Sequence, residues 1–80
     1  MSLASDVASW YESVFKPAWG KTFTYAVVAM PASSPFIPVA ISAAHSREEA
    51  IGIMRTEKRP EIPGVFLAVV GPWGIEGTRA

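Results

Sequence analysis

Residues 39–50 read Val39-Ala40-Ile41-Ser42-Ala43-Ala44-His45-Ser46-Arg47-Glu48-Glu49-Ala50. Within them the pattern changes from that of a strand to that of a helix. The first half is uncharged and apolar, as in a strand. Ser46, followed three positions later by Glu49, is a capping box, in which each residue satisfies a free amide at the start of a helix. The pattern predicts a strand that leads into a helix from Ser46 to about Lys58. The residues that share its apolar face are Ala50, Ile51, Ile53 and Met54.

Two further strands are expected on either side of this unit. Thr22–Met30 and Val65–Val70 are rich in Val and aromatic residues, and Phe36–Ala43 is the strand that precedes the capping box. The loop 31–35 consists of turn-forming residues. Pro38 cannot donate a ladder hydrogen bond, so the strand that carries it is expected at an edge of the sheet.

A helix over Leu3–Phe15 is expected before the first strand. The residues spaced for one helical face are Leu3, Val7, Trp10, Tyr11 and Val14. Pro17 is expected to end this helix.

These elements predict a single α+β domain over residues 1–80 with the order α-β-β-α-β. A short hairpin and a right-handed crossover give a three-stranded antiparallel or mixed sheet in the order 2-1-3. We expect both helices on one face and residues 75–80 loose. Because both faces of the sheet are apolar, the second face would need cover, which predicts a homodimer formed through the sheet or an obligate partner.

Composition excludes several classes of protein. The 80 residues include no cysteine and one histidine, and the formal net charge is zero. Disulfides and thiolate metal sites are therefore excluded, and neither a basic nucleic-acid binder nor an acidic nucleic-acid mimic is indicated. Residues 22–44 are uncharged, but Pro31, Pro35 and Pro38 would break a membrane-spanning helix. We expect a cytoplasmic protein without a membrane segment.

No catalytic, cofactor-binding or metal-ligating set is expected. His45 lies at a strand-to-helix junction without a nucleophile motif, and Glu48 and Glu49 suit the first turn of a helix. The segment Gly71-Pro72-Trp73-Gly74 lacks the spacing of a phosphate-binding loop and indicates a turn.

Two groups of residues are candidates for binding. Arg55, Lys58 and Arg59 form the only basic cluster, which suits either the C-terminal end of a helix or a contact with phosphates or an acidic protein. Trp19 and Trp73 lie in turns that contain glycine, and either cover the sheet edges or serve as exposed interface anchors.

In general build the chain resembles small phage-encoded inhibitors of bacterial defence, the anti-CRISPR proteins in particular. The likeness rests on length, a helix-plus-sheet fold without an active site, and the run Val39–Ala50. It implies a viral protein in the host cytoplasm that sterically blocks a larger complex such as a CRISPR effector. The first hypothesis is thus a non-enzymatic inhibitor or regulator. The alternatives are a small nucleic-acid-binding or transcription-regulatory domain and an enzyme whose site forms across a dimer from His45 and an acid of the other chain.

Overall fold

The structure is a computed structural model that describes residues 2–33, 36–57 and 62–79. It opens with a continuous helix made of α1 (Leu3–Trp10), the π-helical segment η1 (Tyr11–Phe15) and α2 (Lys16–Trp19). The remaining elements are β1 (Tyr25–Pro31), β2 (Val39–Ala44), α3 (Arg47–Thr56), β3 (Val65–Gly71) and β4 (Gly74–Arg79). The α+β class is confirmed.

The sheet has four strands, and the prediction of three was wrong. The order is β2-β1-β3-β4, and every neighbouring pair is antiparallel. The additional strand is β4, within the segment 75–80 that was expected to be loose. Its sequence contains two glycines and little apolar pattern. It is a strand because the turn at residues 71–74 returns the chain along β3, where Ala68 pairs with Thr78.

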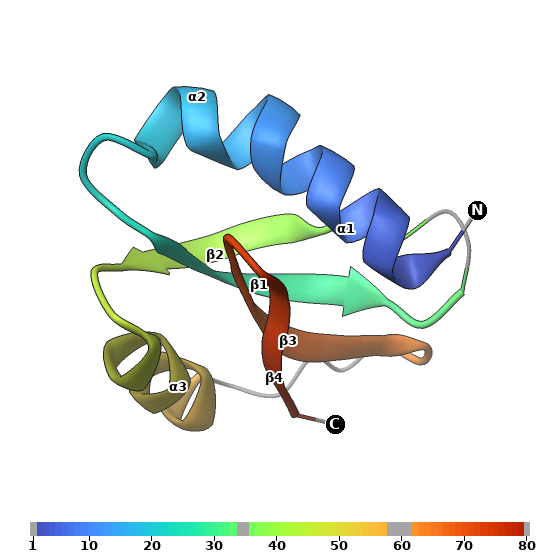
Figure 1. Ribbon diagram of the computed structural model, residues 1–80. Coiled ribbons are helices and arrows are strands. Elements are labelled where there is room, and N and C mark those ends of the chain that lie inside the picture. Colours follow the sequence, from blue (N-terminus) through green and yellow to red (C-terminus); the bar gives the residue numbers. More distant parts are fainter. Residues whose placement is uncertain (1, 34–35, 58–61, 80) are drawn as a thin grey trace.

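The helices lie on opposite faces of the sheet, which corrects the prediction that they share one face (Figure 1). The N-terminal helix buries Val7 and Phe15 against one face, and α3 buries Ala50 and Met54 against the other. The central strands supply both cores, since Ala68 and Val70 of β3 face the N-terminal helix, whereas Leu67 and Val69 face α3. Because successive strand residues point to opposite faces, a continuous apolar strand needs cover on both.

The π-helical segment changes which residues of the N-terminal helix reach the core. The expected face included Val14, but Val14 is 47% exposed, whereas Phe15 is fully buried. A π turn contains one more residue than an α turn, so it rotates Val14 outward and Phe15 inward. The helix also continues past Pro17, which was expected to end it. Pro17 stands at the start of α2, and the wider π hydrogen-bonding pattern before it accommodates a residue without an amide proton.

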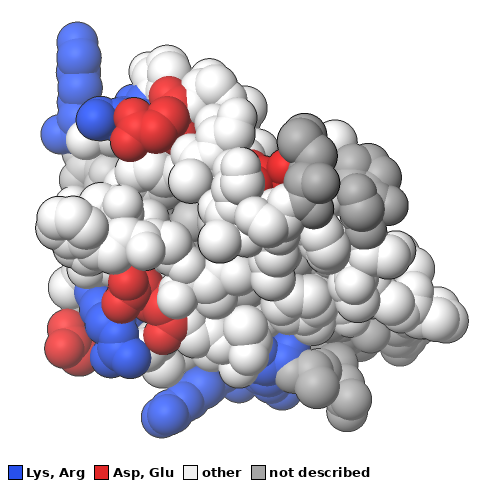
Figure 2. All heavy atoms as spheres, turned by 45° about the vertical axis from the view of Figure 1, so that its right-hand side comes forward, with Lys and Arg blue, Asp and Glu red and all other residues white. Residues whose placement is uncertain are grey.

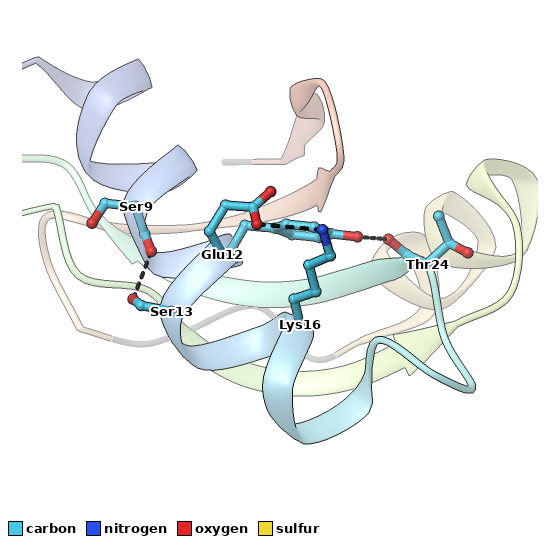
Figure 3. A network of polar contacts seen from close by, with 6 residues as sticks. Ser9, Glu12, Ser13, Lys16 and Thr24 are labelled. Atoms are coloured by element: carbon cyan, nitrogen blue, oxygen red, sulfur yellow. Dashed lines mark hydrogen bonds and ion pairs between the residues drawn. The ribbon is translucent and has the colours of Figure 1, made fainter.

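Two of the polar contacts made by this helix lie within it, and a third joins it to the rest of the chain (Figure 3). The Ser13 hydroxyl donates to the Ser9 carbonyl at 2.6 Å, and Lys16 Nζ lies 3.4 Å from Glu12 Oε2. The Tyr11 hydroxyl donates to the Thr24 carbonyl at 2.6 Å, which ties the helix to the chain just before β1. Burial raises the pKa of the Tyr11 hydroxyl, and the nearby Glu12 and Tyr25 raise it further.

β2 lies at an edge of the sheet, as Pro38 predicted, although Pro38 precedes the strand instead of lying within it. The register between β1 and β2 shifts between Val27 and Val28, so Ile41 is an extra residue with no direct partner on β1. Such a bulge bends an edge strand and redirects its side chains. Ile41 lies beside Phe15 and Trp19 of the N-terminal helix.

Candidate functional site

Large apolar side chains are exposed along β2 and next to it. Ile37 is 62% exposed, Val39 65% and Ile41 42%, and Trp19 at the end of α2 is 42% exposed. We call these four residues the β2 surface. Trp19, Ile41 and Ile37 line hollows on the side of the N-terminal helix, whereas Val39, which pairs with Ala29, lies on the α3 side of the edge strand. The outer side of β2 has no strand partner within the described part of the chain, so its backbone groups are free to pair with another strand.

A pocket of about 370 Å³ opens between the N-terminal helix and β2. Its walls are mainly aromatic and aliphatic: Phe15, Trp19, Phe23, Ala40, Ile41, Ser42 and Ala43. Trp19 is held against Phe15, with ring centroids 5.7 Å apart. Phe15 and Trp19 are therefore held by packing on each other, and the lining of the pocket suits an apolar group.

A second hollow of about 280 Å³ lies farther along the same helix. It brings Val14, the residue that the π segment turns outward, next to Ile37 and Phe36. Asp6, Ser9 and Ser13 form its polar rim, and Trp10 also lines it. The apolar surface thus extends from Trp19 along β2 to the chain before that strand.

At the opposite edge of the sheet, side chains of β4 contact α3. Arg79 Nη1 donates to the carbonyls of Met54 at 3.0 Å and Glu57 at 2.6 Å, which are at the C-terminal end of α3. Arg47 Nε lies 3.3 Å from Glu76 Oε1 at the other end of the helix. These contacts fix β4 to α3 and place charged groups along the edge strand.

The turn between β3 and β4 presents Trp73, whose side chain is 88% exposed. Gly74 has φ +111°, a conformation that suits glycine, and a Cβ at Gly71 would lie 2.6 Å from the Tyr25 ring. The turn therefore requires glycine at both positions, and the pairing of Gly71 with Gly74 holds the backbone on either side of Trp73. A hollow of about 270 Å³ beside it is lined by Ala4, Ala8, Tyr11, Glu12 and residues 71–74.

The predicted binding residues do not come together in one place. Trp19 and Trp73 belong to separate pockets, and Arg55 is exposed near the end of α3 on the opposite face of the sheet. Lys58 and Arg59 lie outside the described residues. On the face in Figure 2, charged side chains gather mainly at the left and lower margins, where several basic groups adjoin acidic ones.

His45 makes two contacts within its own chain, although its side chain is 63% exposed. Its ring packs on Phe23, with centroids 4.8 Å apart, and Nδ1 lies 3.6 Å from Glu49 Oε2 one helical turn later. Among residues 2–33, 36–57 and 62–79, no three acidic or histidine side chains cluster as metal ligands would. None of the described helices has the length and apolar character needed to cross a membrane.

Sequence reasoning missed the residues that create the β2 surface. Ile37, Val39 and Ile41 were assigned to an ordinary strand, and no residue of this group was named as a binding candidate apart from Trp19. Their alternation and the edge position inferred from Pro38 were visible signals. The bulge that redirects Ile41 and the π segment that exposes Val14 leave no such signal in the sequence.

No protein-family model, no curated protein and no solved structure matches this chain.

Proposed function

We propose that the protein is a non-enzymatic binding protein that inhibits or regulates a larger protein or protein complex by occupying part of its surface. The observation that carries this proposal is the presentation of Trp73 on the β3–β4 turn.

Trp73 has the properties of an interface anchor. A tryptophan that is 88% exposed leaves most of its apolar area in water, and burying such area is favourable by roughly 25 cal/mol per Å². Tryptophan is also among the residues most enriched at binding hot spots. Because the pairing of β3 with β4 holds both ends of the turn, little backbone freedom is lost when the indole is buried by a partner.

The hollow beside Trp73 favours a protein as the partner. Ala4 and Ala8 present small side chains toward it, and Tyr11 and Glu12 add a buried aromatic ring and one acidic group. A partner that covers Trp73 would therefore meet a smooth, mostly apolar helix flank. A CRISPR effector complex, the target implied by the resemblance to phage inhibitors, is one candidate for that partner.

The test is affinity capture from a lysate of the source organism or its host, with washes at low and high salt. Tagged wild-type protein is compared with Trp73→Ala and with Ile62→Ala, a control that removes another exposed apolar side chain, 67% exposed. We expect wild type and Ile62→Ala to retain the same stoichiometric protein at high salt. Trp73→Ala should lose it, because truncation of a hot-spot residue costs about 2 kcal/mol or more.

Two outcomes would overturn the proposal. Equal retention of the partner by all three proteins would show that Trp73 is not the anchor. Nucleic acid that is captured at low salt and lost at high salt, with no stoichiometric protein, would favour the nucleic-acid-binding alternative, because phosphate contacts weaken steeply with salt.

A further inference from the structure

We infer that the β2 surface binds a second copy of this chain, with β2 strands of the two copies pairing antiparallel into one continuous sheet. This inference does not rest on the proposed function, because it uses the other half of the sheet from Trp73.

The first argument is charge. Residues 22–44, which include β1, β2 and the chain between them, contain no charged side chain. Edge strands are usually protected from pairing by charged residues, especially lysine, or by proline and bulges. Here Pro38 stands before the strand, so β2 itself lacks proline and charge, and of these devices it carries the bulge at Ile41. An uncharged strand can pair with another uncharged strand without burying a charge, and the β2 strand of a second copy meets this condition.

The second argument is the distribution of apolar groups along β2. The Ile41 half of the strand borders the aromatic pocket, whereas Ile37 protrudes just before the other end. Antiparallel pairing about a twofold axis perpendicular to the sheet keeps the N-terminal helices of both copies on the same side. It also brings the Ile37 end of each copy beside the Ile41 end of the other.

In this arrangement the same contact, between Ile37 of one copy and the pocket of the other, forms twice. Ile37, which borders the N-terminal helix side, approaches the pocket walled by Phe15 and Trp19 in the second copy. A twofold contact of this kind is closed at β2, because the same patch serves both copies and no β2 edge remains for a third; β4 then forms both outer edges of the joined sheet. The net charge of zero adds no repulsion between copies.

The dimer also affects partner binding. The β3–β4 turn lies on the half of the sheet away from β2, so both copies keep Trp73 accessible. A dimer therefore presents two Trp73 turns to a multisubunit target, where the second contact benefits from a high effective concentration.

The experiment is analytical ultracentrifugation over a range of micromolar concentrations. Wild type is compared with Ile41→Lys and Val39→Lys on β2, and with Ile62→Lys as a control for a lysine at another exposed isoleucine. We expect wild type and Ile62→Lys to dimerise equally. The two β2 variants should dissociate at least tenfold more readily, because each would place an unpaired charge in the joined strands.

Hydrogen exchange of the wild-type protein supplies a second readout that needs no variant. The outward-facing amides of β2 should become protected as the concentration rises through the dimerisation range, whereas the turn amides around Trp73 should not. A wild-type monomer across the range would overturn the inference and leave the edge for an extended segment of another protein. A dimer that is unaffected by Ile41→Lys and shows no added protection in β2 would also overturn it.

Discussion

The two edges of the sheet are built from different kinds of residue. At the β4 edge, Arg79 and Glu76 are held by α3 through hydrogen bonds and an ion pair. At the β2 edge, the exposed side chains are Val39 and Ile41, and an apolar pocket lies alongside. Charged contacts within the chain thus hold one edge. At the other edge, Val39 and Ile41 leave much of their apolar surface exposed.

The difference follows from where α3 lies. The helix packs mainly on β1 and β3, and side-chain contacts join its two ends to Arg79 and Glu76 of β4. The N-terminal helix covers the other face, but its C-terminal end meets β2 around a pocket and does not close over it. Stability should therefore depend on the contacts at the β4 edge, while residues at the β2 edge should affect association more than folding.

The strongest test of this difference is Arg79→Ala. The guanidinium donates to two carbonyls that have no further partner within α3, and hydrogen bonds from charged groups are each worth about 1.5–3 kcal/mol. Allowing for partial exposure, we expect the free energy of unfolding to fall by about 2 kcal/mol. Urea denaturation measures the change.

Arg55→Ala is the matched control for Arg79→Ala. Arg55 is an exposed arginine in the last turn of α3, and its replacement should change stability by less than about 0.5 kcal/mol. If both substitutions lower the free energy of unfolding equally, the carbonyl contacts of Arg79 do not stabilise the β4 edge, and the proposed difference between the two edges is wrong.

A smaller, opposite effect is expected for Gly52→Ala in α3. A Cβ at Gly52 would meet nothing within 4 Å, and alanine is favoured over glycine inside a helix by about 0.8–1 kcal/mol. The free energy of unfolding should rise by about that amount, as measured by the shift in the urea midpoint. A decrease would show that the outer face of α3 is crowded in solution.

The sequence predicts the local features of this structure better than the features that depend on long-range contacts. The Ser46 half of the predicted capping box is confirmed, since Ser46 Oγ accepts from the Glu49 amide at 3.1 Å, whereas the Glu49 carboxylate lies 3.6 Å from His45 Nδ1. The buried face of α3 includes Ala50 and Met54 as expected. Both depend on neighbours in the chain. β4 was missed because its residues have weak strand preference and become a strand only by pairing with β3.

The faces covered by the helices were also beyond local reasoning. Periodicity shows that a helix has an apolar side, but it does not say which face of an apolar sheet that side covers. The same reason explains why the sequence predicts only part of the candidate site. Trp73 was recognisable from its turn, whereas the β2 surface depends on the bulge, the π segment and the path of the N-terminal helix.

A weaker effect at the β4 edge is expected for Glu76→Gln. Its ion pair with Arg47 spans 3.3 Å but the arginine side chain is half exposed, so solvent and salt screen the attraction. We expect a loss of at most about 0.5 kcal/mol in low salt, and less as salt increases. Thermal unfolding at two ionic strengths tests this, and an effect that grows with salt would contradict the ion-pair explanation.

The smallest effect on folding is expected at the β2 edge, for Val39→Thr. Val39 is 65% exposed and pairs with Ala29 of β1, and threonine keeps the branched Cβ that suits a strand. In urea denaturation below the concentration at which copies associate, stability should change by less than about 0.5 kcal/mol. The same variant should weaken dimerisation, because the removed methyl group would be buried only between copies. A loss of more than about 1 kcal/mol in the monomer would mean that Val39 packs within its own chain, and the two edges would then differ less than their exposed side chains indicate.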